Sequence, residues 1–297
     1  NITPLEGAGF AGWDTDGDGQ GPFGDLRLRQ AVAMCMDRQA VVDTVMFGQS
    51  VVLDTYIPPD HPLFATDVTS WPFDVEAASA LLDEIGWLDD DGDAATPRVA
   101  SGVTGVPDGT PLEFSYGTTS ATQRQQATQV MGESMALCGM KVNLEYYPAS
   151  EWFADGPEGN LFGRRTDLGQ FAWLTGVEPA CDLYITSQIP GDPTEINPYT
   201  GALYASGWGG QNQTGWSNAE YDTVCNAAKQ SLPGQDAYVD NHIASQEIFG
   251  ENLPVVPLYL RLKLAATRPD FCNFIMDETN NSEFWNVENF GYGPICE

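Results

Sequence analysis

The chain has 297 residues, of which 42% are hydrophobic, so it is long and apolar enough to bury a sizeable core. Its 42 acidic and 12 basic residues give a net charge of −30, which repels polyanions and excludes nucleic acid as a partner. Its apolar runs are interrupted by proline and fall short of the about 20 residues that span a bilayer.

Apolar residues recur at helical intervals over residues 25–48 and again over residues 75–85. The first stretch is expected to break near Cys35–Met36, with Asp37 as the cap of a second helix that Gly48 ends. The second stretch follows an aspartate and precedes a glycine, so both stretches carry helix boundaries as well as a helical period.

The middle of the chain alternates between strand and helix patterns. Alternating apolar positions predict strands over residues 112–116, 141–147 and 167–174. A long helix over residues 120–138 and a short helix capped by Ser150 are expected between them. This succession predicts an α/β fold in which a mixed sheet is flanked by helices.

Residues 179–216 are rich in Gly, Pro and Asn and have little periodicity. A loop of this length in a compact domain is usually functional. Two helices and then two strands are expected after it, over residues 218–229, 235–252, 253–260 and 262–267. No linker or internal repeat divides the chain, so residues 1–297 are expected to form one lobe, with 1–24 as an acidic loop extension.

The sequence contains six cysteines at wide spacing and only two histidines, which argues against a zinc cluster. An even number of separated cysteines predicts three disulfides in an oxidising compartment. The alternative is a set of buried free thiols in a cytosolic protein.

Five motifs follow one another along the chain: FGDLRLRQAVAMCMDRQAVVDTVMFGQ at 23–49, YIPPDHP at 56–62, FDVEAASALLDEIGW at 73–87, GWSNAEYDTV at 215–224 and LPVVPLY at 253–259. In this order they resemble the second, C-terminal lobe of the oligopeptide, dipeptide and nickel class (family 5) of ABC-transporter solute-binding proteins. Read from the residues alone, the motifs are structural, with Arg29 and Gln30 supporting helix packing and a proline pair marking an edge strand.

The resemblance implies a periplasmic-binding-protein-like fold with two lobes that close on a solute like a hinged trap. It implies a non-enzymatic, periplasmic or extracellular protein that hands a peptide or another small solute to an ABC permease. It also implies that the N-terminal lobe is missing, so that the chain is a fragment or a processed product. A membrane anchor on the removed N-terminus is one option.

The resemblance places Trp173, at the end of the third predicted strand, beside the ligand, together with Gly176 in the turn that follows. In peptide-binding members an aspartate shortly after that tryptophan pairs with the α-amino group of the peptide. Here Leu174, Thr175 and Gly176 follow Trp173, and Glu178 comes only later, so this amine anchor is absent or displaced. The change weakens the expectation of a conventional peptide ligand more than that of a solute-binding protein.

The long loop adds aromatic and amide side chains to the candidate ligand site, namely Tyr204, Trp208, Gln211, Asn212 and Trp216. Tryptophans beside amides suit stacking on sugar rings as well as on peptide side chains, so an oligosaccharide is an alternative ligand. The structural alternative is that these aromatics pack the loop onto the core.

Residues 12–25 have the spacing of an EF-hand-type calcium loop. The residues that would supply oxygens to the hard cation are Asp14, Asp16, Asp18, Gln20 through its carbonyl, and Asp25. An aspartate replaces the usual bidentate glutamate at the last position, and no clear helix precedes the loop. A solvated acidic turn is the alternative.

A second acidic loop, GWLDDDGDA, repeats the alternation with Asp89, Asp91 and Asp93. Ala94 replaces the glycine of the calcium loop, and the resembling family often has an Asp-Gly-Asp-Gly turn here without any need for metal. This loop is the second candidate calcium site.

The sequence carries no GxSxG, P-loop or HExxH motif, and its carboxylates are too numerous for one catalytic pair to stand out. The leading hypothesis is therefore the substrate-binding component of an ABC importer. The alternatives are a calcium-stabilised extracellular protein-interaction module, an oligosaccharide-binding transporter component and a secreted carboxylate hydrolase.

Overall fold

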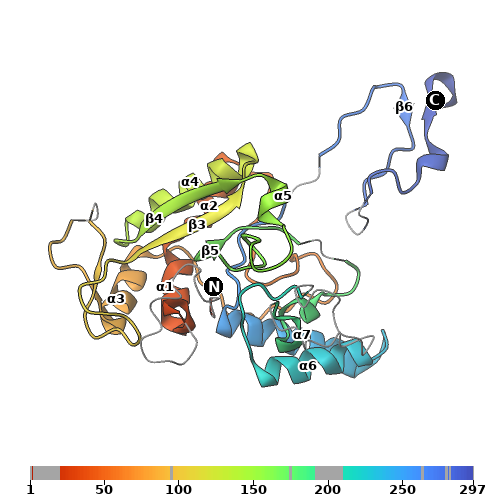
Figure 1. Ribbon diagram of the computed structural model, residues 1–297. Helices are drawn as coiled ribbons and strands as arrows, with labels where there is room; N and C mark the ends of the chain where they lie inside the picture. Colours follow the sequence, from red (N-terminus) through yellow and green to blue (C-terminus); the bar gives the residue numbers. More distant parts are fainter. Residues whose placement is uncertain are drawn as a thin grey trace.

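The centre of the fold is a three-stranded parallel sheet in the order β4-β3-β5 (Figure 1). The computed structural model describes residues 2, 21–93, 96–173, 176–190, 210–261, 264–277, 280 and 282–296. The strands are β3 (Glu113–Thr119), β4 (Lys141–Tyr147) and β5 (Leu168–Gly169). The pairs β3–β4 and β3–β5 are both parallel, so the predicted α/β class is correct while this sheet is parallel rather than mixed.

The third strand is shorter than the predicted span of residues 167–174. Only Leu168 and Gly169 pair with β3. The next carbonyl, that of Gln170, accepts hydrogen bonds from the hydroxyl of Thr118 and the guanidinium of Arg124. Because side chains take this carbonyl, the chain leaves the sheet at the point where the candidate site begins.

The helices of the first half lie within the ranges that the sequence predicts. They are α1 (Leu26–Cys35), α2 (Arg38–Thr44), α3 (Val75–Ile85) and α4 (Thr122–Ala136). Asp37 accepts a hydrogen bond from the backbone of Ala40, and Asp74 accepts one from Ala77. Gly86 closes α3 with a φ of 108°, a conformation that favours glycine. The helix α2 ends four residues before the expected Gly48.

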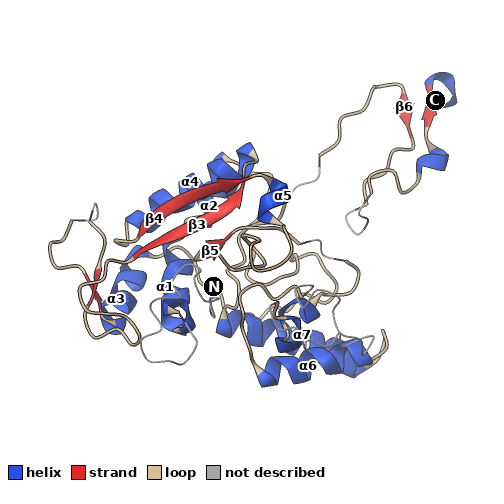
Figure 2. Ribbon diagram, in the orientation of Figure 1, coloured by secondary structure: helices blue, strands red, loops and turns tan. Residues whose placement is uncertain are grey.

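The helix α4 packs along β3 and β4, while α1 and α3 lie below the sheet in the view of Figure 2. The main core lies between these elements and includes Leu28, Leu82, Phe114 and Met131, all buried. A small antiparallel pair, β1 (Trp87–Leu88) and β2 (Val99–Ala100), extends it beyond α3. The short helix α5 (Ala149–Trp152) begins after Pro148 without a side-chain cap, so the prediction that Ser150 caps it was wrong.

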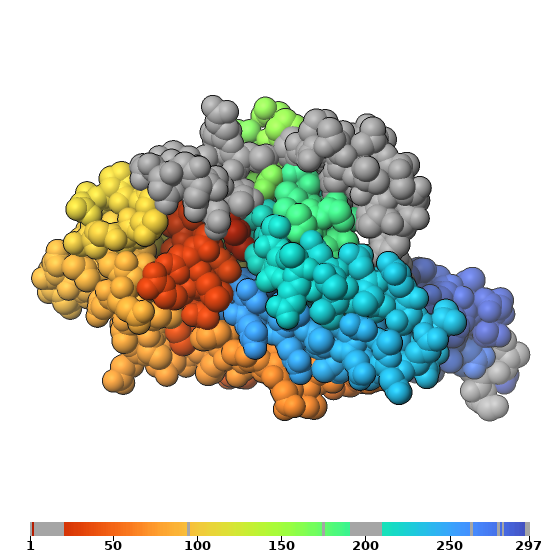
Figure 3. Space-filling view, turned by 90° about the horizontal axis from the view of Figure 1, so that it is seen from below, coloured from red at the N-terminus to blue at the C-terminus, as the bar shows by residue number. Residues whose placement is uncertain are grey.

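A second helical group has its own core. It consists of the short 3-10 helices η3 (Cys181–Tyr184) and η4 (Thr186–Gln188) and of the α-helices α6 (Ala219–Gln230) and α7 (Asp236–Asn252). Asn218 caps α6, and the core of this group contains Tyr221 and Phe249. Seen from below, the residues of α6 and α7 lie against the N-terminal helices (Figure 3).

Arg29 joins the two groups. Its guanidinium is buried and donates to the carbonyls of Phe23, Gly24, Asn252 and Leu253 at 2.7–3.1 Å. The expectation that Arg29 supports helix packing is therefore confirmed. Burial lowers the pKa of Arg29 to about 10, which leaves the guanidinium charged at neutral pH.

Disulfides cross-link both groups, as expected. Cys35 at the end of α1 is bonded to Cys138 after α4, and Cys181 in η3 is bonded to Cys225 in α6. Cys272 is disulfide-bonded as well.

The strands predicted over residues 253–260 and 262–267 are not formed in the described residues of these ranges. The segment makes only an isolated bridge between Val52 and Tyr259. Pro254 and Pro257 lack the N–H groups that a regular ladder needs.

The C-terminal segment stands away from the rest of the chain in Figure 1. It contains the antiparallel pair β6 (Phe271–Cys272) and β7 (Gly291–Tyr292) and the 3-10 helices η5 (Val287–Asn289) and η6 (Gly293–Cys296). No helix among the described residues combines the length and apolarity needed to cross a membrane.

Candidate functional site

A groove of about 250 Å³ opens at the carboxyl ends of β3 and β5. We call it the strand-end groove; its lining comes from segments 53–58, 121–124, 169–173 and 255–261, together with Tyr184 and Phe249. In α/β folds, ligands bind at this edge of a parallel sheet because the loops that follow the strands converge there. The parallel order of the strands thus places these sequence-distant segments around one groove.

Aromatic side chains form one side of the groove. Phe171 and Trp173 meet edge to face with ring centroids 5.3 Å apart, and 36% of Trp173 is exposed. Deeper in the groove, Phe249 contacts Tyr56 and Tyr184 at 5.1 and 5.0 Å. Such a surface can stack on a planar or apolar part of a ligand.

A hydrogen-bonded network lies at the end of β5. The buried side chain of Gln170 donates to the hydroxyl of Tyr259 at 3.1 Å and accepts from the hydroxyl of Tyr116 at 3.3 Å. This arrangement fixes the orientation of the Gln170 amide. Within the described residues the hydrogen of the Tyr259 hydroxyl has no acceptor, so Tyr259 can donate it to a ligand.

Two arginines complete the groove. The guanidinium of Arg124 donates to the carbonyl of Gln170 at 3.4 Å, and its pKa is lowered, chiefly by burial. Arg261 lines the same groove and is exposed. A groove with aromatic walls and these donors can hold a small solute in a defined orientation.

A second cavity of about 110 Å³ lies behind β5 and shares Gln170 and Phe171 with the strand-end groove. Its lining is mostly apolar and includes Val32, Leu161 and Leu253. Segment 3–20, which follows the lining residue Ile2, lies outside the described residues. We place the candidate site in the strand-end groove, where Trp173 and Arg261 are exposed.

Among the ligand-site residues predicted from the sequence, Trp173 lines the groove, whereas Gly176 does not. Tyr204 and Trp208 lie outside the described residues. Gln211 is part-buried, and its backbone N–H lies 3.4 Å from the side-chain oxygen of Gln188.

Asn212 and Trp216 are buried, so the structure favours the alternative of packing over a ligand role. The amide of Asn212 donates to the carbonyls of Tyr184, Ile185 and Trp216 at 2.8–3.2 Å. Trp216 packs against Tyr221 with ring centroids 5.0 Å apart. The structure thus gives both residues the alternative role, that of fixing the loop on the core.

The sequence analysis did not single out Arg124, Gln170, Tyr259 and Arg261 as site residues. They come from three separate parts of the chain, at residues 124, 170 and 259–261, which meet only in the folded structure. The available signal was weak: Arg124 comes soon after a predicted strand, and Tyr259 and Arg261 lie within or just beyond the LPVVPLY motif.

The first acidic loop falls mostly outside the described residues, which include neither Asp14, Asp16, Asp18 nor Gln20. The described member, Asp25, caps α1 and accepts from the backbone of Arg27 at 2.8 Å and from its guanidinium at 2.6 Å. Despite the opposing effect of burial, these hydrogen bonds and the charges of Arg27 and Arg29 leave the pKa of Asp25 below its usual value.

The second acidic loop is ordered by its own hydrogen bonds. Asp89 accepts from the backbone of Gly92, while Asp91 accepts from the backbone of Asp93 and the hydroxyl of Thr96. Across the part of the chain that the structure describes, no three His, Cys, Asp or Glu side chains come close enough to hold a metal ion. Calcium at either loop stays a prediction.

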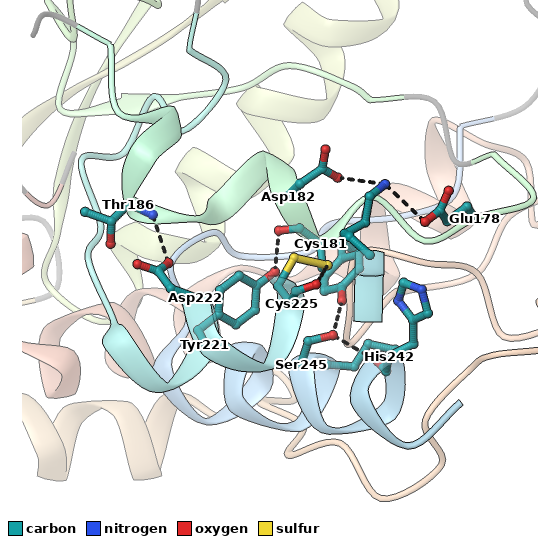
Figure 4. Close-up of a disulfide and its surroundings, with 12 residues drawn as sticks. Glu178, Cys181, Asp182, Thr186, Tyr221, Asp222, Cys225, His242 and Ser245 are labelled. Atoms are coloured by element: carbon teal, nitrogen blue, oxygen red, sulfur yellow. Dashed lines mark hydrogen bonds and ion pairs between the residues drawn. A yellow bond between two sulfur atoms is a disulfide. The ribbon is translucent and has the colours of Figure 1, made fainter. Parts of the chain in front are cut away.

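In the second helical group, the Cys181–Cys225 disulfide lies within a polar cluster (Figure 4). Lys229 forms ion pairs with Glu178 at 3.2 Å and Asp182 at 3.7 Å. His242 lies on the neighbouring helix, fully buried, and neither of its ring nitrogens has a hydrogen-bond partner within the described residues.

A parallel α/β sheet with a solute-sized groove at its strand ends is the architecture of a periplasmic-binding-protein lobe. The model of the bacterial extracellular solute-binding proteins, family 5 (middle region), matches residues 4–194. The chain belongs to this family.

Curated relatives include di/tripeptide-binding protein 2 of Pseudomonas aeruginosa, which is 25% identical over 90% of this chain and 43% of its own length. Heme-binding protein A of Haemophilus influenzae is 21% identical over 90% of this chain and 42% of its own length. The chain thus spans less than half the length of these relatives.

Solved structures have the same fold. The oligopeptide-binding protein of Thermus thermophilus, complexed with a pentapeptide, matches with a TM-score of 0.72 and 26% identity, over 91% of this chain and 44% of that one. A mannohexaose-bound oligopeptide-binding protein of Thermotoga maritima matches with a TM-score of 0.65 and 18% identity, over 89% of this chain and 46% of that one.

Proposed function

We propose that the chain is part of the solute-binding component of an ABC importer and that the strand-end groove receives the solute. The observation that carries this proposal is the groove at the carboxyl ends of β3 and β5, with Trp173 half-exposed beside the fixed amide of Gln170. Membership of family 5 and relatives named for peptide binding support a short peptide as the solute.

The groove is an open site, and the chain covers only 43% of the length of di/tripeptide-binding protein 2. We therefore propose that a second lobe, outside this sequence, closes over the solute and that an ABC permease receives it. The disulfides support a periplasmic or extracellular location, because they persist in oxidising compartments. In this role the protein releases its solute chemically unchanged.

An oligosaccharide is the second candidate solute. The observation that favours it is the aromatic side of the groove, since aromatic rings stack on sugar rings as readily as on apolar peptide side chains. The relative with bound mannohexaose is consistent with such a ligand.

A calorimetric screen of the full-length protein against short peptides and neutral oligosaccharides tests the proposal. Trp173→Ala is expected to weaken binding of the best ligand at least about tenfold, because it removes a stacking surface from the groove. Trp285→Ala is the matched control, since Trp285 is also partly exposed but does not line the groove. Binding that is unaffected by Trp173→Ala would contradict the location of the site.

A further inference from the structure

Positive charge is scarce in this chain, and most of it is neutralised by nearby carboxylates. The sequence holds 12 Lys and Arg residues against 42 Asp and Glu residues. Every one of these cations except Lys263 is described. Six of them form ion pairs with carboxylates, namely Arg27, Arg98, Lys141, Arg165, Lys229 and Arg268.

Three further arginines bond to backbone carbonyls inside the protein. Arg29 does so as described above, Arg38 donates to the carbonyls of Leu53, Trp71 and Pro257, and Arg164 donates to that of Pro190. These side chains are buried and hold chain segments together, so none is available to a ligand.

Arg124 and Arg261 remain, and both line the strand-end groove. Neither forms an ion pair within the described residues, and the one hydrogen bond of Arg124 there is the long contact with the carbonyl of Gln170. The charge of Arg261 is one of the causes that lower the pKa of Arg124, after burial, so the two guanidiniums act on each other. Two neighbouring cations in a partly desolvated groove are unfavourable until an anion enters.

The groove is also free of acidic side chains. About one residue in seven of the chain is Asp or Glu, yet none of the described residues that line the groove is acidic. Asp54, which lies in one of the lining segments, is not itself a lining residue. The net charge of the protein repels anions, whereas the described lining of this groove carries only positive charge.

We propose that Arg124 and Arg261 bind carboxylates of the solute and that the protein therefore selects acidic short peptides. This inference rests on the proposed function and adds the class of ligand. Guanidinium groups pair with carboxylates through parallel N–H···O bonds, and the Tyr259 hydroxyl is placed to add a further donor. Two guanidiniums match two carboxylates, one at the C-terminus of the peptide and one on an acidic side chain.

The test is a calorimetric comparison of Ala-Glu-Ala with Ala-Gln-Ala on the full-length protein. These peptides have nearly the same shape and differ by one charge. We expect the glutamate peptide to bind at least about tenfold more tightly, and the preference to shrink as salt is added. Arg261→Gln removes the preference, whereas the control Arg165→Gln keeps it, because Arg165 pairs with Glu158 outside the groove.

Equal affinities for the two peptides, or a preference that survives Arg261→Gln, would overturn the inference and leave the importer proposal standing. Binding of a neutral oligosaccharide in place of both peptides would likewise overturn the inference and leave the importer proposal standing. If no peptide or sugar binds, both proposals fail. Arg261 is exposed, so its substitution tests the inference even if Arg124→Gln impairs folding.

Discussion

At the scale of single residues, one buried arginine links separate parts of the chain. Arg29 supplies hydrogen bonds to four carbonyls from two separate parts of the chain. No other described residue donates to these carbonyls in its place. Its role is therefore that of a cross-link made of hydrogen bonds.

We predict that Arg29→Met destabilises the fold by about 3 kcal/mol, because the side chain keeps its bulk while buried carbonyls lose their donors. Urea unfolding followed by circular dichroism measures the change. Arg165→Met, at an exposed ion pair, is the control and is expected to change stability by less than about 1 kcal/mol. A similar effect of both substitutions would contradict the cross-linking role.

His242 makes stability depend on pH. Its pKa is lowered, chiefly by burial, and the charged groups that act on it are Glu178, Lys229, His61 and Asp182. The folded state holds the neutral imidazole, and the unfolded chain binds a proton below a pKa of about 6.5. The contribution of His242 is therefore fully present above that pH and is lost as the pH falls through the pKa of the folded state.

We predict that the difference in unfolding free energy between the wild type and His242→Phe decreases as the pH falls below about 6.5. Carboxylate titrations largely cancel in this difference, because both proteins share them. Denaturant titrations at a series of pH values measure it. A difference that does not change with pH would show that the pKa of His242 is the same in the folded and unfolded states, which would contradict the prediction.

At the scale of elements, local chemistry made the helices predictable. Asp37, Asp74 and Asn218 each cap a helix through their own side chains, and Gly86 has the left-handed conformation that ends one. These signals act within a few residues, so the sequence displays them directly. The strand over residues 141–147 was equally clear, because its apolar positions alternate.

Elements that depend on tertiary partners were predicted poorly. The sequence over residues 253–260 is apolar enough for a strand, but its prolines and the side-chain contacts of Arg38 with the carbonyl of Pro257 favour an irregular path. Trp216 and Asn212 looked available to a ligand because burial cannot be read from a loop with no period. Conversely, Arg124 and Arg261 became site residues only through the tertiary fold, which brings residues 121–124 and 255–261 to one groove.

Removing one cap tests the link between local chemistry and helix stability. Asp74→Ala takes away the acceptor for the backbone N–H of Ala77 at the start of α3. We expect a loss of about 1 kcal/mol, measured by thermal and denaturant unfolding. Asp67→Ala removes an exposed aspartate outside any helix and is expected to have little effect.

At the scale of the whole molecule, the net charge of −30 dominates the electrostatics. Self-repulsion of this size opposes compactness, and salt screens it. The two acidic loops are the places where a divalent cation would relieve it most locally. We therefore expect calcium, if it binds, to act on the stability of the chain.

We predict that calcium raises the melting temperature by more than an amount of sodium chloride that gives the same ionic strength. Asp16→Asn is expected to abolish the additional rise if residues 12–25 hold the ion, and Asp91→Asn if the second loop does. Differential scanning fluorimetry with and without a chelator gives the comparison. Equal shifts in both salts would indicate screening alone.

The irregular path of residues 253–261 has a practical consequence. Arg261 projects from a segment without a strand ladder, so its replacement disturbs no sheet hydrogen bonds. If Arg261 binds the solute as proposed, its replacement would change ligand preference with little cost to folding, which is a useful property in a biosensor scaffold. Reversing the charge at this position offers a direct route to variants that report cationic solutes.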